Sequence, residues 1–83
     1  MRITLKLYAM LGQYLPKDAS NNEAEVTISN GETVLDVLNK CAVPLEQCHL
    51  VLVNGTYIEP SARGEHLLQD EDHLAAWPPV AGG

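Results

Sequence analysis

The sequence predicts an α+β fold, in which one main helix packs on one face of a mixed sheet of about five strands. Several short segments alternate apolar and polar residues, as strands covered on one side do. A single segment, residues 33–41, instead has the three-and-four spacing of an amphipathic helix. The 83 residues suffice for one domain only, so the strands and the helix must share one core.

The first two expected strands lie before the helix. Residues 2–8 alternate between an apolar and a polar face, and a helical turn at 9–15 follows, which Pro16 ends. A polar, turn-rich loop at 17–24 leads to a second strand at 25–29. We expect these two strands to pair in the antiparallel direction.

The main helix carries the best local signal in the chain. Thr33 and Asp36, three residues apart, form a variant of the capping box, which marks a helix start. Lys40 suits the negative end of a helix of about nine residues, and Pro44 prevents its continuation. The apolar stripe consists of Val34, Val37, Leu38 and Cys41.

The second half of the chain is expected to supply the remaining strands. Residues 49–53, HLVLV, are apolar on both faces and indicate a central strand, which the tight turn Asn54-Gly55 ends. The elements expected next are a short return strand at 56–58, irregular surface at 60–65, core residues Leu67 and Leu68, an acidic turn at 70–72 and a last strand at 73–77. This order matches the β-grasp architecture, which the pattern alone leaves as one candidate among several.

Composition excludes several classes of partner. With a net charge of −6 and only five Lys and Arg residues, the chain has no basic stripe that could neutralise nucleic-acid phosphates. No segment approaches the roughly 20 apolar residues that cross a bilayer, and we expect a cytoplasmic protein without membrane contact. Cys41 and Cys48 lie in apolar stretches and are expected to be buried free thiols.

Catalytic and metal-binding groups are not evident. Cys48 and His49 are neighbours in a strand and should point to opposite faces, which separates thiol from imidazole. The histidines show none of the ligand spacings of a zinc site, and so we expect no metal. The chain is therefore not expected to be catalytic alone.

The segment after the last expected strand, PPVAGG at 78–83, forms the second part of the predicted organisation: a domain at 1–77 and a flexible, extended tail. Pro78 and Pro79 end strand pairing, and Gly82 and Gly83 are slim enough for a narrow channel. A carboxylate reacts only after activation, for example as an acyl adenylate. The pattern alone leaves two interpretations, a frayed end or a terminus that serves as a partner's substrate.

The sequence resembles the MoaD/ThiS family of ubiquitin-like sulfur carriers. The resemblance rests on ITLKLYA at 3–9, GETVLDVL at 31–38, LVLVNG at 50–55 and LLQDEDHLAAWPPVAGG at 67–83. The ending is most similar to that of the small subunit of molybdopterin synthase. The resemblance therefore covers essentially the whole chain and implies a β-grasp fold.

The resemblance also implies a cycle of activation and transfer. An E1-like enzyme would adenylate the carboxylate of Gly83 with ATP and Mg²⁺, and a cysteine-persulfide donor would replace AMP with sulfur to give a thiocarboxylate. The large subunit of molybdopterin synthase would then use this sulfur on cyclic pyranopterin monophosphate, and no cofactor would stay bound to the carrier. Gly82 and Ala81 are the tail residues required for channel entry, and the expected docking contacts are Trp77, Pro78, Pro79 and Val80.

Two positions depart from the family pattern, and several functions stay open. Glu71 stands where relatives often have glycine, so a positive φ there would cause strain of order 1 kcal/mol. The helix also exits through Cys41-Ala42 instead of the usual glycine. Thiamine thiazole synthesis is the alternative pathway, and molybdenum and tungsten cofactors are both compatible. The sequence is also compatible with a ubiquitin-like modifier of lysines and with a plain interaction module.

Overall fold

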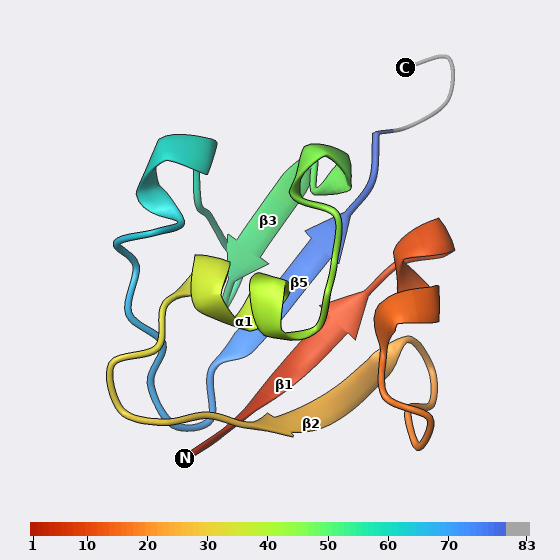
Figure 1. Ribbon diagram of the computed structural model, residues 1–83, viewed down its shortest axis with the longest axis horizontal. Helices are drawn as coiled ribbons and strands as arrows, with labels where there is room; N and C mark the ends of the chain where they lie inside the picture. The colour runs from red at the N-terminus through yellow and green to blue at the C-terminus, as the bar shows by residue number, and fades with distance from the viewer. Residues whose placement is uncertain (80–83) are drawn as a thin grey trace.

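The computed structural model describes residues 1–79 and shows a five-stranded sheet with one α-helix (Figure 1). The strands are β1 (Arg2–Leu7), β2 (Glu23–Thr27), β3 (Leu50–Val53), β4 (Thr56–Tyr57) and β5 (His73–Trp77). The helix is α1 (Val34–Lys40), and three 3₁₀ helices connect the strands: η1 (Ala9–Tyr14), η2 (Leu45–Gln47) and η3 (Pro60–Ala62). The predicted α+β class and single main helix are confirmed.

The sheet is mixed, with the strand order β2-β1-β5-β3-β4. β1 pairs with β2 in the antiparallel direction, as predicted, and with β5 in the parallel direction. β3 pairs with both β5 and β4 in the antiparallel direction. Residues 49–53 were expected to form a central strand, and β3 is indeed an interior strand with a neighbour on each side, although β5 is the middle one of the five. The apolar residues on the outer face of β3 are half-buried rather than covered by a second layer.

Helix α1 begins as its sequence indicates. The Asp36 N–H donates to the Thr33 hydroxyl at 3.1 Å, and the Thr33 N–H donates to the Asp36 carboxylate at 3.0 Å, so both halves of the capping box are present. The helix has 7 residues, shorter than expected. Ala42 takes a left-handed conformation just after it, with φ of 61°, which is unfavourable for a residue with a Cβ atom.

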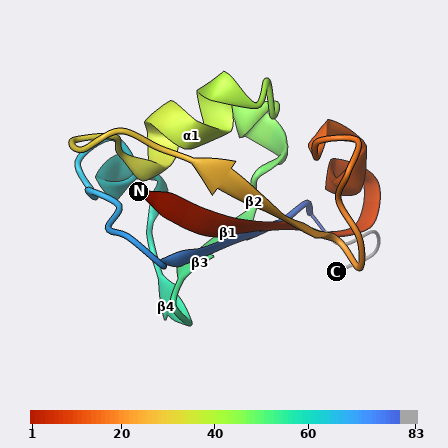
Figure 2. The ribbon, with the colours of Figure 1, turned by 90° about the horizontal axis from the view of Figure 1, so that it is seen from below.

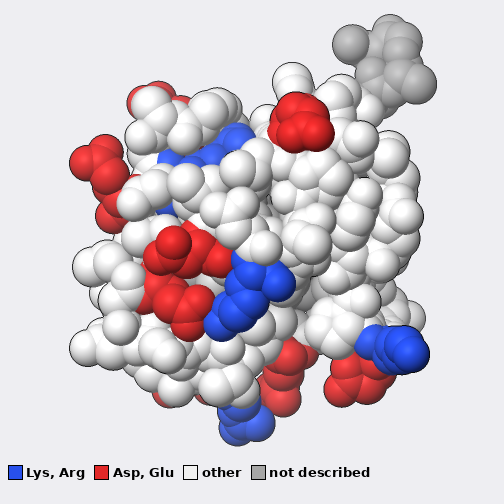
Figure 3. All heavy atoms as spheres, viewed as in Figure 1, with Lys and Arg blue, Asp and Glu red and all other residues white. Residues whose placement is uncertain are grey.

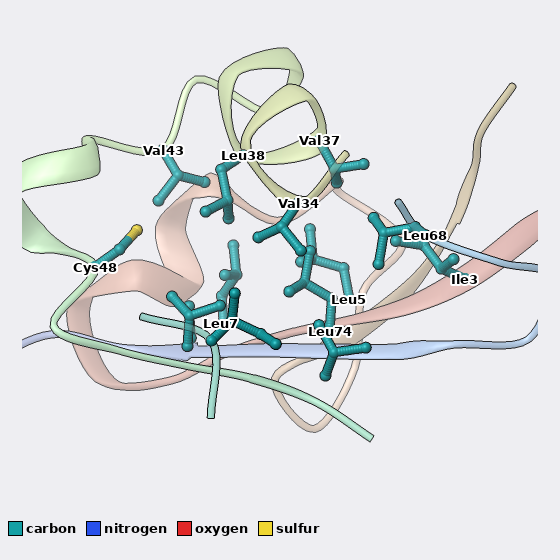
Figure 4. Close-up of a cluster of buried hydrophobic side chains, with 14 of the residues drawn as sticks. Ile3, Leu5, Leu7, Val34, Val37, Leu38, Val43, Cys48, Leu68 and Leu74 are labelled. Atoms are coloured by element: carbon teal, nitrogen blue, oxygen red, sulfur yellow. The ribbon is translucent and has the colours of Figure 1, made fainter. Parts of the chain in front are cut away.

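The core lies between α1 and one face of the sheet, and the other face has no helix over it (Figure 2). In Figure 4, side chains from β1, β5 and α1 point toward one another, including Leu5, Leu74 and Val34, which are 0% exposed. Leu67 and Leu68 were both expected in the core, but only Leu68 is buried there. Leu68 is 2% exposed, whereas Leu67 is 58% exposed. Ile28 is buried although β2 ends before it. Within residues 1–79, no helix is long and apolar enough to span a membrane.

Candidate functional site

The candidate site is the C-terminal end of β5, from which the tail departs. Because β1 and β5 are neighbouring parallel strands, their C-terminal ends lie side by side at the same end of the sheet, where η1 follows β1 (Figure 1). The Tyr8 N–H donates to the Ala76 carbonyl at 3.2 Å, and on the other side the His49 N–H donates to the Trp77 carbonyl at 2.9 Å. The strand is therefore held on both sides up to its last residue.

An aromatic pair lies at this end of the sheet. The rings of Tyr8 and Trp77 are parallel within 9°, and their centroids are 4.5 Å apart. A stacked pair of this kind contributes about 0.5–1.5 kcal/mol beyond the area that it buries. Sequence reasoning missed Tyr8, because only the parallel pairing of β1 with β5 brings it to Trp77.

The aromatic pair belongs to a larger apolar surface on the side of the sheet opposite α1. Leu50 pairs with Trp77, and Leu52 pairs with Tyr57, so these side chains share one face. Tyr57 is 52% exposed and the others are half-buried. The open sheet face is the name used below for Tyr8, Leu50, Leu52, Tyr57 and Trp77. An apolar surface of this type is typical of a docking site.

The two prolines after Trp77 differ in exposure. Pro78 is buried and Pro79 is exposed, so Pro79 is the first exposed residue after β5. The predicted boundary after residue 77 and the predicted docking roles of Trp77, Pro78 and Pro79 stay predictions. The other predicted site residues, Val80, Ala81, Gly82 and Gly83, lie outside the described residues.

An acidic hollow lies at the β2 edge of the sheet. Its volume is about 340 Å³, and its lining is Thr4, Asp18, Ser20, Glu23, Ala24 and Glu25. The hollow is open to solvent, and the Arg2 guanidinium lies 3.4 Å from the Glu25 carboxylate. In the described part of the chain, no three His, Cys, Asp or Glu residues are grouped to hold a metal ion.

The cysteines do not form a nucleophilic site. Cys48 is buried and His49 is exposed, which separates the thiol from the imidazole, although both residues precede β3 and do not lie in a strand as expected. Burial raises the pKa of the Cys48 thiol and of the half-buried Cys41 thiol, so both stay protonated near neutral pH. The Cys48 thiol lies 3.5 Å from the Pro44 carbonyl, to which it can donate.

Arg63 is a buried charge that sequence reasoning placed at the surface. Its side chain is 6% exposed, and it donates from Nε to the Ile58 carbonyl at 3.1 Å and from Nη1 to the Cys48 carbonyl at 2.9 Å. These bonds connect the segments on either side of the β3–β4 hairpin. No local pattern signals this role, because both acceptors are backbone atoms of other segments.

Charge is unevenly distributed over the face that carries α1. Figure 3 shows acidic and basic side chains over the α1 side of this face and a mainly uncharged surface over η1. The sequence of η1, AMLGQY, contains no charged residue, and its Met10 is 50% exposed. The uncharged part of this face therefore lies over η1, which follows β1.

Comparison with models of protein families matches residues 1–81 to a family described as Mut7-C ubiquitin. The match ends before Gly82 and Gly83 and does not bear on them. No curated protein matches the chain.

Solved structures similar to the chain include two structures of SAMP1 proteins and one complex. The crystal structure of SAMP1 from Haloferax volcanii has a TM-score of 0.70 at 24% identity and covers 100% of both chains. The solution structure of small archaeal modifier protein 1 (SAMP1) from Methanosarcina acetivorans has a TM-score of 0.68 at 27% identity, covering 99% of this chain and 96% of that one. A chain in the complex of subunits 1 and 2 of molybdopterin-converting factor from Helicobacter pylori has a TM-score of 0.62 at 16% identity, and the match covers 100% of both chains. These likenesses confirm the β-grasp fold.

Proposed function

Because this chain belongs to the Mut7-C ubiquitin family and has a ubiquitin-like β-grasp fold related to MoaD and SAMP proteins, we propose that it is a sulfur carrier. In this proposal the C-terminal carboxylate of Gly83 is the site of modification. The domain docks on partner enzymes, and the partners carry out the chemistry.

The observation that carries the proposal is the place where β5 ends. β5 is the middle strand of the sheet and ends at Trp77 beside the open sheet face. The sequence PPVAGG follows directly. A partner that covers the open sheet face would therefore have the tail next to its own surface, and glycines at 82 and 83 would let the carboxylate enter a narrow channel.

The proposed chemistry begins with activation by an E1-like enzyme that uses ATP and Mg²⁺. A carboxylate oxygen of Gly83 attacks the α-phosphorus of ATP, and pyrophosphate leaves, which gives an acyl adenylate. The terminal sulfur of a cysteine persulfide then attacks the acyl carbon, and AMP leaves with the bonding electrons. A second thiol reduces the resulting acyl disulfide, so that a thiocarboxylate and a new disulfide on the donor side remain.

The proposed destination of the sulfur is cyclic pyranopterin monophosphate in the synthesis of molybdopterin. The Helicobacter pylori structure, described as a complex of subunits 1 and 2 of molybdopterin-converting factor, supports a large-subunit partner for this fold. Thiamine thiazole synthesis is the alternative destination for the same thiocarboxylate. The two destinations share the activation step and differ in the acceptor.

The test is incubation of the purified chain with an E1-like enzyme, ATP, Mg²⁺ and a persulfide donor, followed by intact-mass spectrometry. We expect a gain of about 16 Da, the exchange of one oxygen for one sulfur, located on the C-terminal peptide. A chain lacking Gly82 and Gly83 is the control and should gain nothing. The absence of this gain with every E1-like enzyme of the source organism would reject the proposal, and function that survives the truncation would favour a plain interaction module.

A second candidate function is modification of other proteins. It is supported by the two similar structures of SAMP1, one of which is described as a small archaeal modifier protein. The same acyl adenylate would then be attacked by a lysine amine, with loss of AMP, to form an isopeptide bond. An adduct that survives reduction and hydroxylamine distinguishes this function from sulfur transfer, because a thioester does not survive.

A further inference from the structure

Tyr8 is tied to the tail end of the sheet through both its backbone and its ring. Its N–H extends the β1–β5 ladder to the Ala76 carbonyl, and its ring covers one face of the Trp77 indole. The Leu11 N–H in turn donates to the Tyr8 carbonyl at 3.0 Å, and Leu11 is 0% exposed. Tyr8 is therefore anchored to the core through η1 while it contacts Trp77.

The backbone next to Tyr8 is strained. Ala9 has φ of 52°, in the left-handed region that is unfavourable for a residue with a Cβ atom. This conformation ends β1 and turns the chain into η1, which places Leu11 in the core. Strained residues of this kind are concentrated at functional sites.

We infer that Tyr8 is a positioning residue that acts through Trp77 to set the direction in which the tail leaves the domain. The inference rests on the proposed function. Trp77 is the last residue held by strand pairing, and Pro78, whose φ is fixed by its ring, follows it and is buried. The direction of the chain at Pro79 thus depends on how Trp77 is held.

The effect on rate follows from the geometry that the chemical step needs. Reacting atoms must approach within about 3–3.5 Å, and a misplacement of about 1 Å can lower a rate about 100-fold. A change in the direction in which the chain enters a partner's channel would misplace the carboxylate and so lower the rate of the chemical step.

Tyr57 is the matched control on the same surface. It belongs to the open sheet face but pairs with Leu52 at the β4 edge, with β3 between it and β5. Its removal takes away docking surface without touching the end of β5. Tyr8→Phe is the conservative control, because it keeps the stacked ring and removes only the hydroxyl.

The experiment measures pyrophosphate release by an E1-like enzyme that charges the wild-type chain, as a function of carrier concentration. We expect Tyr8→Ala to lower kcat about 10- to 100-fold, Tyr8→Phe to retain it, and Tyr57→Ala to change KM alone. Trp77 is the only tryptophan of the chain, so its fluorescence and near-UV circular dichroism should change in Tyr8→Ala and not in Tyr57→Ala. If Tyr8→Ala does not fold, Tyr8→Leu keeps an apolar side chain without the aromatic stack and takes its place.

The outcomes separate the inference from the proposed function. If no E1-like enzyme charges the wild-type chain, the proposed function fails and the inference fails with it. If the wild-type chain is charged and Tyr8→Ala has an unchanged kcat, or changes KM alone with an unaltered Trp77 signal, the inference alone is wrong. A lower kcat with a changed Trp77 signal, restored by phenylalanine, supports it.

Discussion

The two ends of β5 are built in opposite ways. At the N-terminal end, the Asp72 carboxylate accepts hydrogen bonds from the Gln69 N–H at 2.8 Å and from the Asn54 amide at 2.9 Å. The Asn54 side-chain oxygen accepts the His73 N–H at 2.9 Å. At the C-terminal end, the contacts of Trp77 are backbone pairing and the aromatic stack.

This contrast indicates which end is available to a partner. The N-terminal end satisfies its polar groups within the domain, so a partner would gain little by covering it. The C-terminal end leaves aromatic and aliphatic area exposed beside the tail, and covering this area would be favourable. We therefore expect changes at the polar end to affect stability and changes at the apolar end to affect transfer.

The largest expected effect is at the tail. Gly82→Val should abolish formation of the thiocarboxylate, because a branched side chain blocks a narrow channel, and should leave the melting temperature unchanged. Gly64→Ala is the matched glycine control within the domain, since an added Cβ there would be 3.5 Å from Leu35, an ordinary contact. Intact mass and thermal unfolding report the two quantities. A lower melting temperature in Gly82→Val would show that the tail packs on its own domain.

A smaller effect is expected at the polar end of β5. Asp72→Ala should lower the free energy of unfolding by about 0.5–1.5 kcal/mol, because the Gln69 N–H and the Asn54 amide exchange this carboxylate for water. Charging, measured at a temperature where the variant is folded, should match the wild type. Asp18→Ala, in the exposed acidic hollow, is the control and should change stability little. Impaired charging in a folded Asp72→Ala chain would contradict the division between the two ends.

A change at the neighbouring residue should stabilise the chain. Glu71 has φ of 72°, as expected at a position where relatives often have glycine. Glu71→Gly should therefore raise the free energy of unfolding by about 0.5–1 kcal/mol, the relief of strain less the greater freedom of glycine in the unfolded chain. Glu71→Ala keeps the strain and should give no such gain in denaturant titrations. Equal stabilisation by both variants would attribute the effect to loss of charge.

The smallest expected effect is on the pH dependence of stability. Two hydrogen bonds lower the pKa of the Glu32 carboxyl below its usual value of 4.5. The Ser29 N–H makes the larger contribution and the Lys40 side chain the smaller one. The stabilising contribution of Glu32 is therefore present above about pH 4.5 and is lost as the pH falls through the lowered pKa. Glu32→Gln should flatten the decline of melting temperature below that pH. An unchanged acid profile would show that Glu32 contributes nothing measurable.

Elements with local signals could be predicted from the sequence. The Thr33 and Asp36 pair lies within one turn, and the helix begins at Val34, directly after Thr33. The positive φ of Glu71 could be anticipated because the resemblance indicates that glycine is usual there. Alternation located the strands to within a few residues but did not show that β5 would be the middle one.

The features that could not be predicted depend on distant segments. Tyr8 meets Trp77 only because β1 and β5 pair in parallel. Arg63 is buried because carbonyls of Cys48 and Ile58 lie within its reach. Leu67 and Leu68 are equivalent in the sequence, and the local direction of the chain decides which one enters the core. Each outcome requires the three-dimensional arrangement and not the local pattern.

The central position of β5 also has a consequence for the order of events during synthesis. The strand that joins the β1–β2 pair to the β3–β4 pair is the last of the five to be made. Until it is in place, Tyr8 of the first pair and Leu50 of the second have no strand between them and no shared surface. In the proposed mechanism, an activating enzyme that docks on the open sheet face would therefore not recognise unfinished or unfolded chains, and only folded carriers would be charged with sulfur.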